Sequence, residues 1–357
     1  MHPRVELRFW CDRHFVSQAR SIVSAYDESI VTQTIVSGKL RRYHHLSVWQ
    51  HLAWPSLVLK NIRDAFLVGV GVVQSFVKLV IWRPDAIFTK GGYVCLPVGI
   101  AARILRIPLV IHDSDAHPGL TNRILSRWAY AITTGAPLEY YSYPSAKSTY
   151  VGIPIHHDFH PYTEKQRQQA KSEWGIRGDK PLVVVTGGGL GAKRINEVVS
   201  EVLSKLLQTY SVILVAGAGQ YDELRSLLPP DNDEFQLYPF INTMPRLLAA
   251  ADVVVTRAGA TTMLELAATG TPTIVVPNAK LSGGHQVKNA KVYADAGAVR
   301  VVDEDEMVAN PALLVEAVKS VVGDPQRTKR MVGAFRKFAK PDAARRVAER
   351  IVAAARR

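Results

Sequence analysis

Short apolar runs alternate with helical patterns along the first half of the chain, and polar or glycine-rich turns separate them. Strands are expected at residues 5–10, 32–36, 86–89, 109–112, 131–135 and 148–152. Helical patterns lie between these runs, including a long one over residues 47–81 that is broken near Pro55. Strands and helices that alternate in this way predict a parallel sheet with helices on both faces.

The pattern begins again after residues 156–180, which are polar and indicate a connector. Further strands are expected at residues 182–186, 211–216, 235–240, 252–256 and 273–276, and helices follow from Glu304 onward. The predicted fold class is therefore α/β, with two facing doubly wound domains and a cleft between them. We expect the first domain at residues 1–155, the second at 156–340, and a closing helix at 341–357 that packs on the first domain.

One segment of the second half carries the most informative chemistry. The apolar run Val253–Thr256 ends in Arg257-Ala-Gly-Ala260, a helix of small residues follows, and another apolar run begins at Thr273. In a parallel sheet, such a helix N-terminus lies at the carboxyl end of the strands, where N–H groups and the helix dipole favour a phosphate. Because Glu265 in the same helix can turn its carboxylate to a ribose diol, the segment predicts half of a nucleotide-sugar site.

A glycine-rich turn, Gly187–Ala192, follows one predicted strand and precedes a helix, which suits backbone N–H groups that approach a diphosphate. A dinucleotide site would also need an acidic residue at the end of the next strand. That strand ends in Val215-Ala-Gly-Ala-Gly219, without a carboxylate. We therefore favour the phosphate site of a nucleotide-sugar enzyme over the dinucleotide site of a dehydrogenase. The structural alternative for the glycines is a tight turn that lets helix and strand pack closely.

Three more segments follow predicted strands. Phe240–Pro245 offers a backbone amide and carbonyl to the edge of a base, although an ordinary loop has the same pattern. Lys90-Gly-Gly-Tyr93 is a second glycine turn suited to phosphate approach. His112-Asp-Ser-Asp115 places an imidazole and two carboxylates where a general base is needed, with a structural histidine and loop-capping aspartates as the alternative.

The neighbouring side chains of His156-His157 should diverge too far to share an ion, so neither a metal nor a cofactor is expected.

Composition narrows the choice of partners. A net charge of +13 and a pI near 9.7 indicate an anionic partner, and nucleic acid is not expected because no RNA-binding or helix-turn-helix signature accompanies the charge. Cys11 and Cys95 form no CxxC pair, which fits a reducing cytosol, and no signal peptide is expected at the N-terminus. The apolar stretch of residues 65–82 favours a buried or half-buried helix of the first domain. The alternative is a helix whose apolar face rests on the bilayer, and the two interpretations are compatible.

These motifs together resemble those of the MurG family, the peripheral-membrane N-acetylglucosaminyltransferases that complete lipid II in peptidoglycan synthesis. The resemblance runs from about residue 84 to the C-terminus and rests on the order and spacing of Lys90–Tyr93, Ile107–His112, Pro118–Asn122, Gly187–Ala192, Phe240-Ile241, Arg257–Ala260, Glu265, Gln286–Asn289 and Pro341-Asp-Ala-Ala. It implies a GT-B fold and inverting, metal-free transfer of N-acetylglucosamine from UDP-N-acetylglucosamine to the C4 hydroxyl of lipid I (undecaprenyl-diphospho-N-acetylmuramoyl-pentapeptide). It also implies a peripheral enzyme at the cytoplasmic face of the cell membrane, with the anionic membrane surface as a partner.

The resemblance further implies roles for individual residues. Ile241 would meet the uracil and Glu265 the ribose. The donor side would comprise Asp115, His156, Gly188, Gly189, Asn196, Ile241, Arg257, Ala260, Thr261, Thr262, Glu265, Gln286 and Asn289. The acceptor side would comprise Gly91, Gly92 and Asn122, with His112, Asp113 and Tyr93 as candidate catalytic residues.

The sequence departs from the family in three places. Gly189 and Leu190 replace a serine and a glutamine of the family, and His156 stands where an arginine is expected. The family also opens with a strand, a Gly-Gly-x-Gly-Gly-His loop and a helix that this sequence does not contain, and the loss of that central strand should leave unpaired sheet edges. We expect that the start codon was assigned too late, and the alternative is an enzyme with impaired activity. Sequencing the DNA upstream of Met1 decides between them, because only the first explanation requires the glycine-rich segment to be encoded there in frame.

Two rival functions stay open. One is a GT-B glycosyltransferase with another lipid acceptor, such as diacylglycerol, which UDP-release assays with the two acceptors would separate. The other is a non-catalytic protein that binds UDP-N-acetylglucosamine without turnover.

Overall fold

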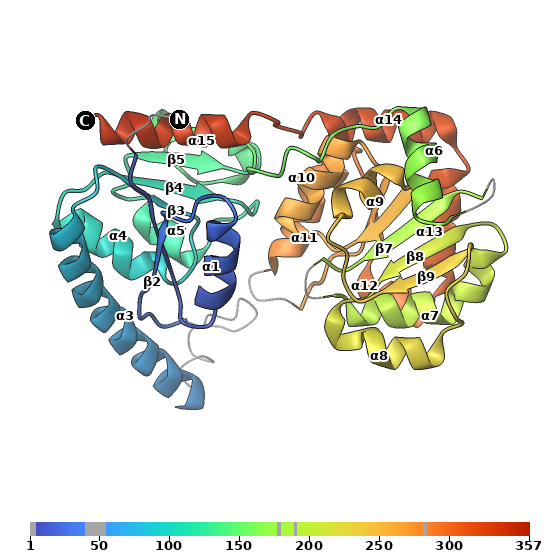
Figure 1. Cartoon of the computed structure of the whole chain (residues 1–357), viewed down its shortest axis with the longest axis horizontal. Helices are drawn as coiled ribbons and strands as arrows, with labels where there is room; N and C mark the ends of the chain where they lie inside the picture. The colour runs from blue at the N-terminus through green and yellow to red at the C-terminus, as the bar shows by residue number, and fades with distance from the viewer. Residues whose placement is uncertain (1–4, 40–54, 177–179, 189–190, 281–283) are drawn as a thin grey trace. The chain divides into compact units, whose positions relative to one another are not determined.

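The computed structural model describes residues 5–39, 55–176, 180–188, 191–280 and 284–357. The chain forms two compact units (Figure 1). The first unit comprises residues 1–113, 118–150 and 346–357, and the second comprises residues 114–117 and 151–345. Each unit is built from parallel strands and helices, as the alternating sequence pattern predicts.

The described strands of the first unit form two separate parallel sheets. The smaller sheet pairs β1 (Arg8–Cys11) with β2 (Val31–Thr34). The larger sheet runs in the order β3 (Ile87–Thr89), β4 (Leu109–Asp113), β5 (Ala131–Thr134) and β6 (Ser148–Tyr150). Within the described ranges no strand pair joins the two sheets, so β1 and β3 each keep an edge that no other strand covers.

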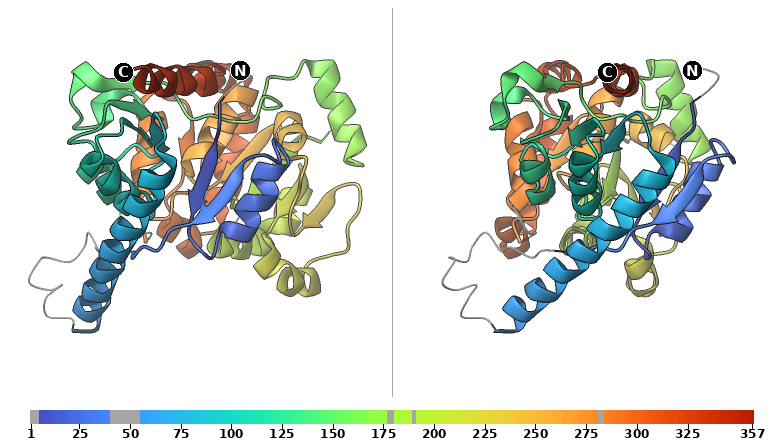
Figure 2. Two further views of the ribbon diagram at one scale, coloured as in Figure 1. Left: turned by 60° about the vertical axis from the view of Figure 1, so that its left-hand side comes forward. Right: turned by 90° about the vertical axis from the view of Figure 1, so that its left-hand side faces the viewer.

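Helices and short 3₁₀ turns accompany these strands in the described part of the unit. They are α1 (Val16–Ser24), α3 (Pro55–Trp82), α4 (Cys95–Ile104), α5 (Leu120–Leu125), η1 (Leu138–Tyr140) and η2 (Ser145–Lys147). Leu79 of α3 packs in the same core as Leu109 and Ile111 of β4. The part of the predicted long helix that precedes Pro55 lies outside the described residues, and from Pro55 onward α3 extends beyond the sheets of its unit (Figure 2).

The second unit has one six-stranded parallel sheet in the order β12-β11-β10-β7-β8-β9. Its strands are β7 (Leu182–Thr186), β8 (Ser211–Val215), β9 (Phe235–Tyr238), β10 (Val253–Thr256), β11 (Thr273–Val275) and β12 (Arg300–Val301). The strand order reverses between β7 and β10, and ligands of open parallel sheets bind in the crevice beside the carboxyl ends at such a reversal. β7, β8 and β10 are buried along their whole length, which agrees with their continuous apolar sequences.

Helices cover this sheet and continue to the C-terminus. They are α6 (Glu164–Glu173), α7 (Lys193–Leu207), α8 (Ala218–Leu227), α9 (Met244–Ala250), α10 (Ala260–Thr269), α11 (His285–Asp295), α12 (Glu304–Ala309), α13 (Ala312–Val322), α14 (Pro325–Arg336) and α15 (Ala343–Ala355). On α7, Ile195, Val198, Val199 and Val202 recur at helical spacing and are buried. The last helix, from Arg346 onward, belongs to the first unit, where Ala354 packs with residues of β4 and β5.

The connector of residues 156–180 contains a helix that its polar sequence concealed. Thr163 and Gln166 form a capping box at the start of α6, and this satisfies N–H groups that a helix leaves unpaired. Arg167 and Lys171 then bind the two carboxylate oxygens of Asp252 at 2.7 and 2.6 Å. The helix is therefore held by charge and capping rather than by an apolar stripe.

Candidate active site

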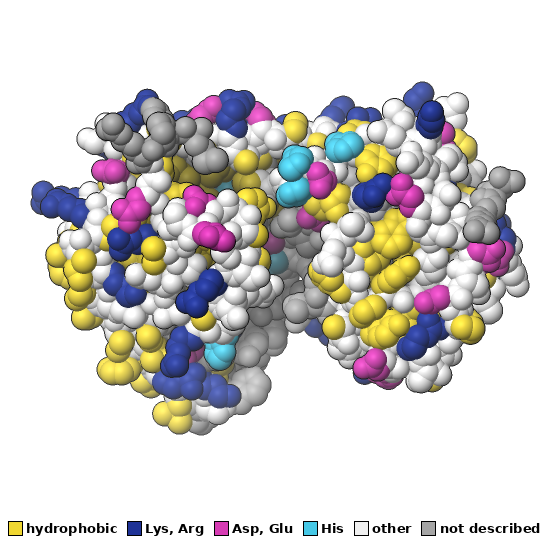
Figure 3. All heavy atoms as spheres, in the orientation of Figure 1, with side chains coloured by type: hydrophobic (Ala, Val, Ile, Leu, Met, Phe, Trp, Pro, Cys, Tyr) yellow, Lys and Arg dark blue, Asp and Glu magenta, His cyan; other side chains and the backbone are white. Residues whose placement is uncertain are grey.

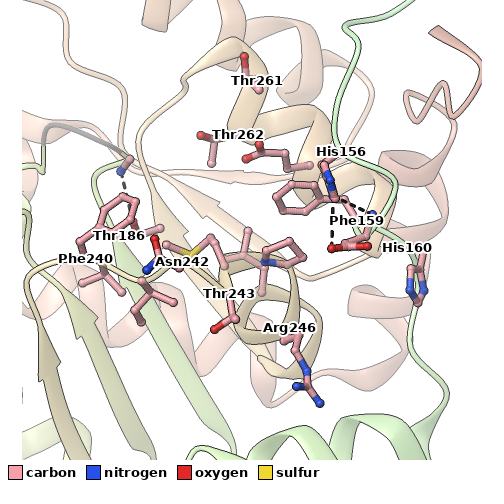
Figure 4. Close-up of a pocket in the computed structure, with 18 of the residues that line it drawn as sticks. His156, Phe159, His160, Thr186, Phe240, Asn242, Thr243, Arg246, Thr261 and Thr262 are labelled. Carbon is pink, nitrogen blue, oxygen red and sulfur yellow. Dashed lines mark hydrogen bonds and ion pairs between the residues drawn. The ribbon is translucent and has the colours of Figure 1, made fainter. Parts of the chain in front are cut away.

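A pocket of about 740 Å³ opens in the second unit beside the carboxyl ends of the central strands. Three groups of residues surround it: the turn after β7, the loop after β9 with the start of α9, and the first turns of α10 (Figure 4). The connector around His156 and Phe159 closes a further side. Because β7 and β10 flank the reversal of strand order, the pocket lies where the topology favours a ligand.

The glycine turn after β7 brings backbone close to the pocket. Gly188 has a φ of +76°, which favours glycine, and its N–H donates to the Thr186 hydroxyl at 3.2 Å. A Cβ on Gly187 would collide with the backbone of residues 191–192, so the turn needs glycine there as well. Thr186 and Gly188 line the pocket, whereas Gly189 lies outside the described residues.

Helix α10 presents its first turns to the same pocket. Its N-cap residue is Gly259, so no capping side chain accepts a hydrogen bond from the first N–H groups of the helix. Ala260 begins the helix, and Thr261, Thr262 and Glu265 line the pocket at helical spacing. Burial raises the pKa of Glu265 to about 7. The helix thus offers an anion-binding terminus and, one turn further on, a carboxylate in a partly dry setting.

The loop after β9 forms the wall opposite α10. Ile241 is buried, lines the pocket and lies shortly after the end of β9 at Tyr238. Phe240 beside it is 61% exposed although it also lines the pocket, so its ring is available to a planar ligand. This arrangement suits a base whose edge meets the backbone at Ile241.

The connector contributes a group of aromatic and ionisable side chains to the pocket, of which the sequence predicted only His156. His156, as predicted for the donor side, lines the pocket, together with Asp158, Phe159, His160 and Tyr162. The expectation that the His156 and His157 side chains diverge is wrong, since their ring centroids lie 4.3 Å apart. The reason is local: Asp158 contacts both rings and draws them together.

Two residues assigned to the donor side have structural roles instead. Asn196 is 1% exposed, and its amide donates to the Ala216 carbonyl and to Gln220, which ties α7 to the turn before α8. Arg257 is buried, donates to the Val276 carbonyl and forms an ion pair with Glu304. Both predictions need correction, because these side chains are committed to internal partners and neither lines the pocket.

Asp115, Gln286 and Asn289 lie together in the second unit. The Asn289 amide donates to Asp115 Oδ1 at 2.9 Å and to the Ala258 carbonyl at 3.1 Å, and its oxygen accepts from the Ala116 N–H. Gln286 accepts from the Asn278 N–H at 2.9 Å. Since Asn289 is 3% exposed and engaged at both ends, it positions the loop that carries Asp115 rather than presenting a free amide to a ligand.

His112 is fully buried in the first unit. Its Nδ1 lies 3.0 Å from the Thr133 hydroxyl, which itself donates to the Ile111 carbonyl, so Nδ1 carries the proton of the neutral ring. Burial, and next the charge of Lys90, lower the pKa of His112 to about 3. Asn122 is also fully buried and donates to the His112 carbonyl, and a Cβ on Gly91 would come within 2.5 Å of the Asn122 amide. Gly92, next to Gly91, is exposed.

The other two candidate catalytic residues meet partners that the sequence did not indicate. Asp113, 6% exposed at the end of β4, accepts a 2.5 Å hydrogen bond from the Tyr143 hydroxyl. Tyr93 is hydrogen-bonded to Asp12, and burial together with that carboxylate raises the pKa of Tyr93 to about 12. Because Tyr93 stays protonated and His112 stays neutral and enclosed, Asp113 is the one of the three candidates that carries a carboxyl group, the kind of side chain that can serve as a general base.

The sequence matches known proteins across both units. Residues 182–347 match the glycosyltransferase family 28 C-terminal domain, and residues 30–134 match the glycosyltransferase family 28 N-terminal domain. A relative from Clostridium perfringens, named UDP-N-acetylglucosamine–N-acetylmuramyl-(pentapeptide) pyrophosphoryl-undecaprenol N-acetylglucosamine transferase, is 35% identical over 297 residues, or 82% of this chain and 77% of the relative. A relative from Bacillus thuringiensis, whose name gives the same activity, is 33% identical over 285 residues, or 79% of this chain and 75% of the relative.

Solved structures resemble the whole chain. The crystal structure of Acinetobacter baumannii MurG has a TM-score of 0.72 at 24% identity and covers 98% of this chain and 100% of its own. A calicheamicin glycosyltransferase has a TM-score of 0.66 at 16% identity and covers 99% of this chain and 91% of its own. At these identities the likeness establishes the fold, and the predicted GT-B architecture is confirmed.

Proposed function

We infer from its membership of glycosyltransferase family 28, among the MurG-type enzymes, that the chain is an N-acetylglucosaminyltransferase. It transfers N-acetylglucosamine from UDP-N-acetylglucosamine to lipid I, and the product is lipid II. The observation that carries the inference is the position of Glu265 in the pocket of the second unit, on the helix whose N-terminus faces the same space. A ribose diol and a diphosphate are the two groups that such a carboxylate and such a helix terminus recognise.

We assign the donor to this pocket in three parts. The uracil meets the backbone at Ile241, beside the exposed ring of Phe240. The ribose hydroxyls donate to Glu265, and the diphosphate takes N–H groups from the turn at Gly188 and from the first turn of α10 at Thr261. Asp115 and Gln286 are assigned to the sugar, with Asn289 holding the loop of Asp115 in place.

The proposed chemistry needs one proton acceptor and one stabilised leaving group. The acceptor C4 oxygen attacks the anomeric carbon of the donor, and its proton passes to the Asp113 carboxylate. The bond from the anomeric carbon to the phosphate oxygen breaks, and its electron pair leaves with UDP. Backbone N–H groups and the α10 dipole stabilise the charge that develops on UDP, a role that requires no metal ion.

The donor assignment is tested by calorimetric titration of the full chain with UDP-N-acetylglucosamine, UDP-glucose and ADP-glucose. We expect tightest binding of UDP-N-acetylglucosamine and the weakest of ADP-glucose, because the base meets a backbone edge of fixed geometry. UDP release should then depend on lipid I and not on diacylglycerol. Release with diacylglycerol alone would contradict the proposed acceptor.

The donor affinity is expected to rise with pH. The pKa of Glu265 is about 7, and an ionised carboxylate accepts a stronger hydrogen bond from a ribose hydroxyl than a protonated one. Donor affinity should therefore increase by up to about tenfold between about pH 6 and about pH 8. Calorimetric dissociation constants at several pH values measure this, with Glu265→Gln as the control that removes the dependence. An equal slope in the variant would contradict the assignment.

We propose that the enzyme works peripherally at the cytoplasmic face of the cell membrane, through helix α3. Ser56–Trp82 is long and apolar enough for a membrane span by length and composition alone, but only 17% of its most apolar window is buried. Seven exposed large apolar side chains recur along one side of this helix at helical spacing: Leu59, Ile62, Phe66, Val70, Val73, Val77 and Val80. We call these seven residues the α3 stripe.

The α3 stripe is better suited to lie on a membrane than to cross it. The opposite side of the helix is packed, with Asp64 1% exposed and Ser75 and Leu79 at 0% and 1%. A helix that keeps one face in a protein core offers only its other face to lipid. The protein's positive charge favours an anionic surface, and Lys60 and Arg63 lie exposed near the start of the helix.

Replacing Phe66 and Val73 by Glu should weaken binding to vesicles of anionic phospholipid by about tenfold or more, because each change removes buried apolar area and adds a charge at the interface. Co-sedimentation with the vesicles measures the effect. Val308→Glu is the matched control, since Val308 is 41% exposed on α12 of the second unit. Equal loss in the control, or no loss in the α3 variant, would contradict the proposal.

A further inference from the structure

Three consecutive residues of the connector, His156, His157 and Asp158, have side chains that lie close together. His156 Nδ1 lies 3.3 Å from Asp158 Oδ2, and His157 Nε2 lies 3.2 Å from Asp158 Oδ1. The three potential ligand atoms lie within 4.8 Å of one another. Figure 3 shows histidine side chains gathered next to an acidic one on the surface of the molecule.

We propose that His156, His157 and Asp158 bind a Zn²⁺ ion at the rim of the nucleotide pocket. Two imidazole nitrogens and one carboxylate oxygen are ligands that Zn²⁺ takes in proteins, at about 2.0–2.2 Å. All three side chains are exposed, so small rotations bring them to bonding distance, at the expense of the long 3.4 Å hydrogen bond from the Asp158 N–H to His156 Nδ1. Three protein ligands leave the fourth tetrahedral position open to water or to a ligand oxygen.

The position of this zinc site ties it to the pocket. His156 and Asp158 line the pocket, whereas His157 does not. Before the ion binds, Asp158 places a negative charge at the rim of a pocket that also contains Glu265. The ion adds two positive charges, and the rim changes from one negative to one net positive charge.

Zn²⁺ should therefore tighten binding of the anionic nucleotide, and the nucleotide should tighten binding of Zn²⁺ by the same factor. This coupling rests on the proposed donor site, but the zinc site itself does not. Zinc then acts as a modulator of donor binding and not as a participant in the transfer step.

The zinc site is tested by calorimetric titration of the full chain with a zinc salt in the absence of nucleotide. We expect one saturable ion per chain and a loss of affinity of about tenfold or more in His157→Ala, because one ligand is removed. His160→Ala is the matched control, an exposed histidine of the same connector that lies outside the three ligands, and it should bind zinc like the native chain. Absence of saturable binding, or equal binding in His157→Ala, overturns the site.

The coupling is tested by measuring UDP affinity with and without saturating zinc. We expect UDP to bind roughly threefold or more tightly with zinc in the native chain, and no such gain in His157→Ala. Association of zinc with UDP in solution is common to both chains and cancels in the comparison. An equal gain in both overturns the coupling. If UDP does not bind at all, the proposed function fails, and the titration without nucleotide still judges the zinc site.

Discussion

Replacing Asp113 by Asn is expected to lower kcat by about 10³-fold and to leave the KM for UDP-N-acetylglucosamine unchanged. The amide keeps the shape of the carboxylate and can still accept from the Tyr143 hydroxyl, but it cannot take the proton of the acceptor hydroxyl. Donor affinity stays the same because the pocket assigned to the donor belongs to the second unit, whereas Asp113 ends strand β4 of the first. Steady-state kinetics with lipid I measure both parameters.

Two further variants make this result specific. Asp85→Asn is the matched control, since Asp85 is an exposed aspartate just before β3, at the opposite end of the same sheet, and it should retain full activity. Tyr143→Phe removes the 2.5 Å hydrogen bond to Asp113 and leaves the carboxylate, so its loss should be smaller and should change the pH profile of kcat. Full activity of Asp113→Asn would exclude Asp113 as the base.

Replacing Glu265 by Gln is expected to weaken donor binding by about tenfold to 100-fold, because a charge-assisted hydrogen bond to the ribose becomes a neutral one. The affinity for UDP should fall by the same factor, since the ribose is common to both ligands. Calorimetry with UDP measures it. Glu223→Gln, a change in an exposed glutamate of α8, is the control that should bind UDP like the native chain.

The same substitution should stabilise the protein above neutral pH. The pKa of Glu265 rises from its ordinary 4.5 to about 7 on folding, so the folded chain holds this proton more tightly than the unfolded chain. Native stability therefore falls as pH rises from 4.5 through 7, by at most about 3 kcal/mol for this group, and Gln removes that loss. The melting temperature of Glu265→Gln should exceed that of the native chain at about pH 8 and match it at about pH 4. Lower stability at the higher pH, with unchanged UDP affinity, would contradict the assigned role.

The fold could be predicted where the sequence pattern is local. Strand β7 (Leu182–Thr186) is a continuous apolar run that glycines follow directly, and β8 and β10 obey the same rule of buried parallel strands. Helix α6 escaped prediction because it has no apolar stripe and depends on Asp252, which lies 85 residues beyond Arg167 in the sequence. Periodicity cannot report a helix that is held by charges from another element.

The site was predictable where a residue's role follows from its own element. Glu265 shares a helix with Thr261 and Thr262, so helical spacing alone places all three on one face. The resemblance to the family assigned Arg257 and Asn196 to the donor side, but Glu304 and the Ala216 carbonyl bind them from distant parts of the chain. Tyr143 had no sequence signal at all, since only the packing of β4 beside β5 brings its loop to Asp113. Such long-range pairs require the structure.

The most direct test of the account is product formation by the full chain from radiolabelled UDP-N-acetylglucosamine and lipid I. We predict that label enters a lipid product in an amount equal to the UDP released, with a β-linked N-acetylglucosamine on the C4 oxygen of the muramoyl residue, and that Asp113→Asn forms this product far more slowly. Saturable binding of UDP-N-acetylglucosamine without transfer of label to lipid I would contradict the account and would identify the chain as a binding protein.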